Sequence, residues 1–283
     1  MIKPILSDQA FLDDVLSARQ LSDHVHLWWL GQSGFLLGWM EDFVAIDPYL
    51  SDALTVKYAA TDKPHVRISE RVVDPAALNF VSLILCSHIH TDHLDKDTLR
   101  PMLSGNPSAQ VIAPAALLPT VAERSGRPIA DLWGADAGNK PIVIGGFRIT
   151  AVPSAHDTVE RDDQGRCRFL GYVIQMNDFC IYHSGDTMLY DGLAEVLRPF
   201  RIDVALLPIN GRAPERRVAG NLNGREAAAL AKQIGAKLVI PHHYDMFMFN
   251  TADPAAEFIP ECERVGQPYR VLKLGERWTP QNV

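Results

Sequence analysis

The chain has 283 residues, of which 47% are hydrophobic and 22% are charged, a composition that excludes a disordered protein. Its 34 acidic residues outnumber its 27 basic ones, and the net charge of -7 argues against a nucleic-acid partner, because affinity for phosphate backbones depends on Lys and Arg. No apolar run approaches the roughly 18 residues of a membrane span, the N-terminus lacks a signal-peptide pattern, and the four cysteines show no paired spacing. We therefore expect a cytoplasmic protein with reduced thiols and no membrane partner.

The predicted elements follow one another without a linker or a low-complexity stretch. The first half is expected to hold a helix after residue 7, strands at 26–30, 34–39 and 43–46, an irregular surface segment at 51–74, a buried strand at 81–87, a helix near 94–102, a strand at 110–113 and a helix at 115–125. The second half is expected to hold strands at 142–144, 147–152, 169–175, 179–183, 203–207, 237–240 and 269–273, and helices at 193–197, 225–235 and 254–265. This order predicts an α/β fold in a single domain over residues 1–283, with two similar halves packed sheet against sheet.

The most specific motif is the stretch Ser87-His-Ile-His-Thr-Asp-His-Leu-Asp95. His88 and His90 are two residues apart at a strand end, so their side chains point the same way. Asp92 and His93 follow in the turn before the next helix. One metal ion rarely takes four ligands this close in sequence, whereas two adjacent ions can share them. A helix N-cap role would account for Asp92, but it would leave the three histidines unexplained.

Other strand ends carry further side chains that bind metals. His156, Asp186 and the pair His242-His243 each follow an apolar predicted strand. Each of them alone would be an ordinary polar residue, but α/β folds build their sites at the carboxyl ends of strands, and here the placement is repeated. We therefore expect these side chains to meet those of the His88–His93 stretch.

The succession HxHxDH, a lone His, Gly-Asp-Thr and Ile-Pro-x-His-Tyr resembles the metallo-β-lactamase superfamily. The resemblance implies a four-layer αββα sandwich, with two mixed sheets face to face and helices outside. Trp28-Trp-Leu-Gly-Gln-Ser-Gly34, His183-Ser-Gly-Asp186 and Ala236-Lys-Leu-Val-Ile-Pro-His-His243 resemble the L-ascorbate-6-phosphate lactonase branch and relatives known only as metal-dependent hydrolases. The match runs from about Trp28 to Asp253, although this chain is shorter than the lactonase and has Gln32 where several relatives have His.

Carried over residue by residue, the resemblance implies two metal sites. The first metal ion would be held by His88, His90 and His156, the second by Asp92, His93 and His243, and both by a bridging Asp186. The neighbouring His242 would then be a packed or supporting residue. Asp47 matches a position that orients the ligands from outside, as a carboxylate beside a ligand histidine does.

The resemblance and the residue types together predict the chemistry. Five histidines and two aspartates form a nitrogen and oxygen site without thiolate, which suits zinc, manganese or iron. The lactonase resemblance implies Mn²⁺ and the wider superfamily Zn²⁺, so two divalent metal ions are the expected cofactors. A hydroxide between them would attack the carbonyl or phosphorus of a small anionic lactone, ester or phosphoester. Asp92 is the expected catalytic residue, because it could also carry a proton to the leaving group.

Residues on the substrate side of the site can also be proposed from the sequence. Arg212, Arg216 and Arg217, in the loop after the strand at 203–207, could hold a phosphate or carboxylate, and Arg212 is the preferred candidate because it is nearest the strand end. Gln32 could line the mouth. Two other functions stay open, namely a phosphodiesterase or nuclease of the same fold and a non-catalytic regulatory protein that binds metal. The sequence also leaves open whether the chain forms a homo-oligomer.

Overall fold

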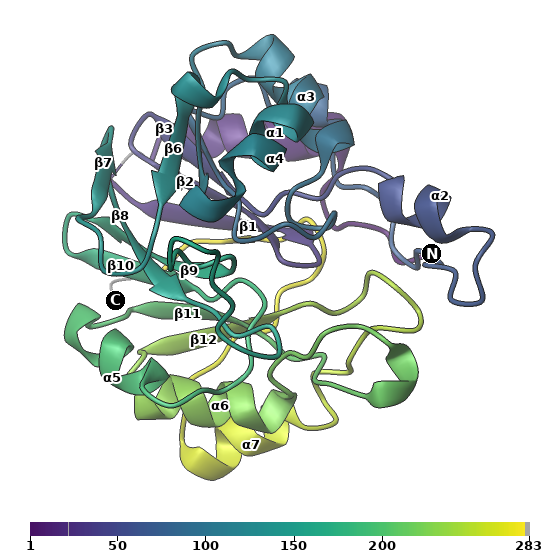
Figure 1. The fold of residues 1–283 in the computed structure, drawn as a ribbon, viewed down its shortest axis with the longest axis vertical. Helices are drawn as coiled ribbons and strands as arrows, with labels where there is room; N and C mark the ends of the chain where they lie inside the picture. The colour runs from purple at the N-terminus through teal and green to yellow at the C-terminus, as the bar shows by residue number, and fades with distance from the viewer. Residues whose placement is uncertain (22, 281–283) are drawn as a thin grey trace.

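Two mixed β-sheets pack face to face at the centre of the computed structural model, which describes residues 1–21 and 23–280 (Figure 1). The seven-stranded sheet has the order β13-β1-β2-β3-β4-β5-β6, and the six-stranded sheet has the order β12-β11-β10-β9-β8-β7. In each sheet an antiparallel meander continues into parallel strands. The two halves are therefore built alike, and the predicted sandwich of two sheets is confirmed.

Helices cover the outer faces of both sheets. The strands of the first sheet are β1 (Val25–Gly31), β2 (Gly34–Trp39), β3 (Asp42–Ile46), β4 (Leu83–Leu85), β5 (Gln110–Pro114), β6 (Leu132–Ala135) and β13 (Arg277–Trp278). Those of the second are β7 (Ile142–Ile144), β8 (Phe147–Pro153), β9 (Leu170–Met176), β10 (Phe179–His183), β11 (Val204–Pro208) and β12 (Leu238–His242). The helices α1 (Asp8–Arg19), α3 (Lys96–Gly105) and α4 (Leu118–Ser125) lie over the first sheet, and α5 (Leu193–Leu197), α6 (Gly224–Gln233) and α7 (Phe258–Val265) lie over the second (Figure 1). None of the helices described is long and apolar enough to cross a lipid bilayer.

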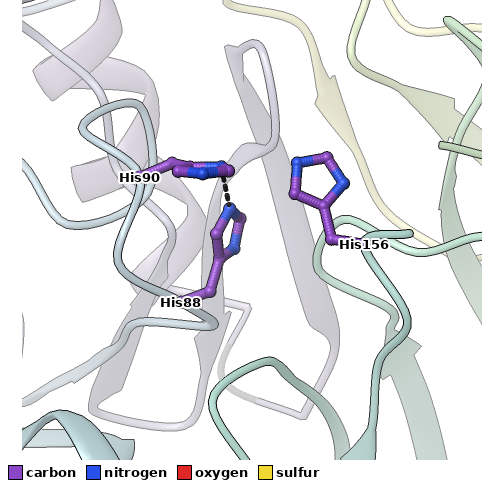
Figure 2. A group of neighbouring side chains, drawn as sticks. All are labelled: His88, His90 and His156. Carbon is purple, nitrogen blue, oxygen red and sulfur yellow. Dashed lines mark hydrogen bonds between the residues drawn. The ribbon is translucent and has the colours of Figure 1, made fainter. Parts of the chain in front are cut away.

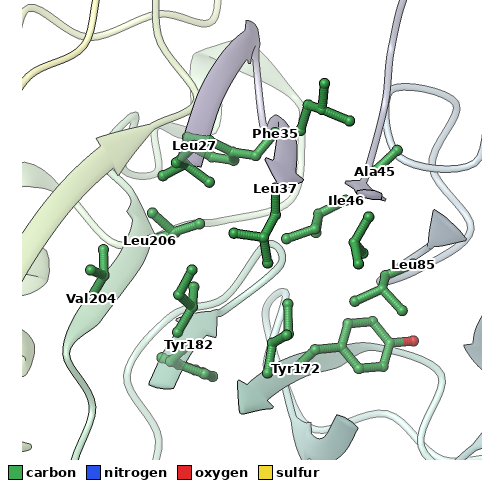
Figure 3. Close-up of a cluster of buried hydrophobic side chains, with 14 of the residues drawn as sticks. Leu27, Phe35, Leu37, Ala45, Ile46, Leu85, Tyr172, Tyr182, Val204 and Leu206 are labelled. Carbon is green, nitrogen blue, oxygen red and sulfur yellow. The ribbon is translucent and has the colours of Figure 1, made fainter. Parts of the chain in front are cut away.

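Apolar side chains from both sheets fill the space between them (Figure 3). Leu37 and Ile46 from the first sheet share one buried cluster with Tyr172, Tyr182 and Leu206 from the second. Every residue of β11 is buried, because the other sheet covers one of its faces and helices cover the other. This explains why the central strands read as continuous apolar runs in the sequence.

The loops of the site leave the sandwich where parallel strands end. β3 and β4 are parallel neighbours, so Asp47 after β3 lies beside the loop that follows β4. In the other sheet β10, β11 and β12 are also parallel, which brings the loop carrying Asp186 next to His243. The fold thus places segments far apart in the sequence at one edge, as the strand-end pattern predicts.

Two predicted elements are wrong. The strand expected at 269–273 is absent, because only Tyr269 forms an isolated bridge and the later β13 pairs with β1 instead. Leu272 is buried all the same, so the apolar character of this segment reflects core packing rather than sheet pairing. The segment at 51–74 is not wholly irregular, since it contains the helix α2 (Ala53–Tyr58).

Candidate metal centre

The loop after β4 supplies four of the predicted ligands. The helix α3 behind it is capped by Asp95, whose side chain accepts a hydrogen bond from the backbone N–H of Asp97, so capping does not account for Asp92. Possible metal ligands gather in three overlapping groups: His88, His90 and His156 (Figure 2); Asp92, His93 and His243; and His88, His93 and Asp186. Within each group the ligand atoms lie within 4.8 Å of one another. All seven predicted ligands therefore come together, although they follow four different strands.

Asp186 lies between the two main groups. Its Oδ2 is 3.6 Å from Nε2 of His156 in the first group and 3.2 Å from Nε2 of His243 in the second. Its Oδ1 is 3.4 Å from Nε2 of His93. One carboxylate thus faces histidines of both groups, the position that a bridging ligand requires.

Hydrogen bonds from behind orient three of the histidine rings. Nδ1 of His93 lies 2.7 Å from Oδ2 of Asp47, and Nδ1 of His156 lies 2.6 Å from the carbonyl oxygen of Gly220. Because both oxygens only accept, the Nδ1–H groups donate and the Nε2 lone pairs are left to face the site. Nδ1 of His88 lies 2.9 Å from Oγ of Ser87, and this contact orients the His88 ring in the same manner. The predicted supporting role of Asp47 agrees with this geometry.

Burial and charge shift the pKa values in opposite directions within the centre. Burial lowers the pKa of His88 well below its usual value and that of His90 to about 4, so both rings are neutral near pH 7 and keep their lone pairs. Burial would also lower the pKa of His93, but the carboxylates of Asp186, Asp92 and Asp47 raise it well above the usual value. A cation at this position therefore competes with a proton for His93.

The donor atoms fit a divalent cation. Nε2 of His93 is buried without a hydrogen-bond partner, and it lies 3.4 Å from Asp186 and 3.7 Å from Asp92. With metal–ligand bonds of about 2.1 Å, neighbouring ligands of one ion are about 3.0–3.6 Å apart. The separation from Asp186 lies within this range and that from Asp92 is slightly longer, so the three atoms could surround one ion with small adjustments, and their nitrogen and oxygen donors suit Zn²⁺ or Mn²⁺.

Three other predicted residues have different outcomes. Gln32 reaches the centre, with its side-chain Nε2 2.8 Å from Oδ2 of Asp92. His242 belongs to none of the ligand groups, because its ring stacks on that of His183 at a centroid distance of 4.9 Å. Arg212 does not line the cavity over the ligands: its side chain is exposed and contacts Met188 Sδ at 3.3 Å. The role of Arg212 in holding a phosphate or carboxylate stays a prediction.

A cavity of about 420 Å³ opens over the ligands, and it includes an aromatic wall that the sequence did not indicate. Tyr58, His65 and Phe247 form an aromatic wall, in which the rings of Tyr58 and His65 stack with centroids 4.1 Å apart. Arg124 and Arg217 supply positive charge. Tyr58 and His65 belong to the segment at 51–74, which the sequence predicts to be an irregular surface segment. The cavity thus has both apolar and cationic sides.

Comparison with known proteins identifies the family. Residues 44–244 match the beta-lactamase superfamily domain. The chain belongs to the metallo-β-lactamase superfamily. A UPF0173 metal-dependent hydrolase from Methanoregula boonei is 30% identical over 81% of this chain and 86% of its own length. Another, from Caldivirga maquilingensis, is 28% identical over 88% of this chain and 94% of its own length. Igni18, a metallo hydrolase from Ignicoccus hospitalis whose structure is known, is 25% identical, with 91% and 98% of the two chains covered and a TM-score of 0.66.

Membership of the metallo-β-lactamase superfamily confirms the αββα sandwich that the motifs imply. The names of these relatives contain no substrate. The narrower resemblance to the L-ascorbate-6-phosphate lactonase branch therefore stays a prediction.

Proposed function

We propose that this protein is a binuclear metal-dependent hydrolase of a small anionic lactone, ester or phosphoester. The observation that carries the proposal is the position of Asp186, whose carboxylate lies 3.2–3.6 Å from histidines of both ligand groups. A structural metal site is closed by its ligands, whereas these groups lie at the floor of an open cavity. The names of the relatives, which are metal-dependent hydrolases, support the same class of reaction.

Two divalent ions, Mn²⁺ or Zn²⁺, would be shared among the seven side chains. His88, His90 and His156 would hold one ion, Asp92, His93 and His243 the other, and Asp186 both. Such ions supply an activated water and polarise the oxygen that gains charge during the reaction. Asp47 keeps His93 in the tautomer that can bind, and Gly220 does the same for His156.

Asp92 would have a second task, which is to move the proton. Both Asp92 and Asp186 line the cavity, but the side chain of Asp92 is 14% exposed and that of Asp186 only 3%, so Asp92 is the more accessible carboxylate. A carboxylate there can accept a proton from the attacking water and deliver it to the leaving group. Lys57 and Arg217 at the cavity wall would attract the negative group of the substrate.

The proposal can be tested by loading the metal-free protein separately with Mn²⁺ and Zn²⁺. We expect about two ions per chain by elemental analysis and hydrolysis of at least one lactone, ester or phosphomonoester in a substrate panel. Turnover of RNA, DNA or other phosphodiesters alone would favour the nuclease alternative. Binding of two ions without any hydrolysis would support the non-catalytic alternative, and binding of one ion would contradict the binuclear centre.

A further inference from the structure

The turn between β1 and β2 reaches into the second ligand group. Gln32 in this turn is 1% exposed and has a φ of +51°, a conformation that non-glycine residues rarely adopt. Its carbonyl oxygen accepts hydrogen bonds from the indole N–H of Trp29 and from the backbone N–H of His243, at 3.1 and 3.0 Å. The backbone of Gln32 is therefore fixed relative to His243, and the left-handed conformation at this turn directs its side chain into the centre.

The side-chain amide of Gln32 occupies a ligand position. Its Nε2 is 2.8 Å from Oδ2 of Asp92 and 3.2 Å from Nε2 of His243. The separation from His243 falls within the range between neighbouring ligands of one cation, about 3.0–3.6 Å, and the separation from Asp92 is slightly shorter. Oε1 of the same amide is buried and has no hydrogen-bond partner. A half-turn of the amide exchanges its oxygen and nitrogen without moving any other atom of the side chain.

A cation in the second group would reverse the preferred orientation of this amide. The NH₂ group points at Asp92 and His243, whose lone pairs a cation would use. In the present orientation the NH₂ group, which carries partial positive charge, would face the ion and be repelled by it. After a half-turn the carbonyl oxygen would face the ion, and the interaction would be attractive. We propose that Gln32 is an additional ligand of the second metal ion and binds it through Oε1 after this half-turn. Amide oxygens are ligands that harder divalent ions such as Mn²⁺ accept readily.

This inference rests on the binuclear centre of the proposed function, and the test separates the two. The variants are Gln32→Leu, which has similar size but neither donor nor acceptor, and Gln32→Glu, which keeps the shape and can only bind through oxygen. Gln233→Leu at the exposed end of α6 is the matched control. The measurements are the ions bound per chain, the dissociation constant of the second ion by competition with a chelator, and the visible absorption of the Co²⁺-loaded protein.

We expect Gln32→Leu to weaken the second ion at least about 10-fold while the first stays bound, and to change the Co²⁺ absorption bands. Gln32→Glu should bind the second ion at least as tightly as the original chain. This result tests the proposal independently, even if Gln32→Leu fails to fold. Unchanged binding in Gln32→Leu would overturn the proposal. Equal weakening in both variants would also overturn it, because the amide would then act as a hydrogen-bond donor to Asp92. Binding of a single ion by the original chain would instead contradict the proposed binuclear centre and therefore also the proposal that Gln32 binds a second ion.

Discussion

Two adjacent histidines at the end of β12 have different surroundings. His243 has a φ of +65°, which breaks the alternation of the strand and turns its ring towards Asp186. His242 keeps strand geometry, and its ring stacks on His183 with an interplanar angle of 4°. Strand periodicity alone would not distinguish them, because it does not apply once the backbone leaves the extended region.

We predict that His243→Ala removes the second metal ion, whereas His242→Ala keeps both. The second variant should instead lower the free energy of unfolding by about 2–4 kcal/mol, because it leaves a cavity where a buried ring packed. Elemental analysis and chemical denaturation of the metal-free proteins measure the two effects. Loss of metal in His242→Ala with retention in His243→Ala would mean that the two ligand assignments are exchanged.

Asp186 is the residue on which both metal sites depend. Burial would raise the pKa of its carboxyl group, but His243 and His93 beside it hold that pKa well below the usual value, so it is ionised near pH 7. Asp186→Ala should therefore reduce binding from about two ions to fewer than one per chain and abolish hydrolysis. Asp191→Ala, at an exposed position of the following loop, is the control. Full metal content in Asp186→Ala would exclude the bridging role.

At the scale of elements, the metal-binding loop after β4 depends on α4. The guanidinium of Arg124 donates hydrogen bonds through one nitrogen to the carbonyl oxygens of Ile89 and Leu94, at 2.5 and 3.0 Å. These carbonyls flank the turn that carries Asp92 and His93. The helix thereby holds in place a loop that has no regular backbone pairing of its own.

We predict that Arg124→Met speeds hydrogen exchange of the amides between residues 88 and 94 and lowers the free energy of unfolding by about 1.5–3 kcal/mol, the range for hydrogen bonds to a charged group. Arg100→Met is a matched control, because Arg100 also donates to two carbonyl oxygens, but at the end of α4 rather than in the loop. Equal exchange in the loop for both variants would show that Arg124 does not position it.

Over the whole molecule, one apolar core joins the two sheets. All five tryptophans lie in strands of the seven-stranded sheet, namely Trp28, Trp29, Trp39, Trp133 and Trp278. Their fluorescence therefore reports mainly on that sheet, although Trp39 also packs on Phe147 and Trp29 on Tyr244 from the other half. Leu206 belongs to the other sheet, where it is fully buried on β11.

This distribution allows a test of the prediction that residues 1–283 form a single domain. Leu206→Ala should destabilise the protein by about 2–5 kcal/mol and shift the urea transition seen by tryptophan fluorescence, although the substitution is in the opposite sheet. Circular dichroism should give the same midpoint. A fluorescence midpoint that does not move, with a separate transition by circular dichroism, would mean that the halves unfold independently.

The sequence alone was sufficient for features that depend on local patterns. Apolar runs predicted most strands, and the His or Asp residues after four of them predicted a metal site at one edge, because chain direction and strand order determine where loops leave a sheet. The set of seven ligands was implied by the resemblance to the metallo-β-lactamase superfamily. Contacts between distant loops were decided only by the tertiary structure. Part of the segment at 51–74 forms a cavity wall, Arg212 is exposed against Met188, and Arg217 lines the cavity while it pairs with Asp62. Gln32 meets Asp92, 60 residues later in the chain, only because the first hairpin folds over the loop after β4. Such contacts depend on side-chain directions and loop conformations, for which the periodicity of helices and strands contains no information.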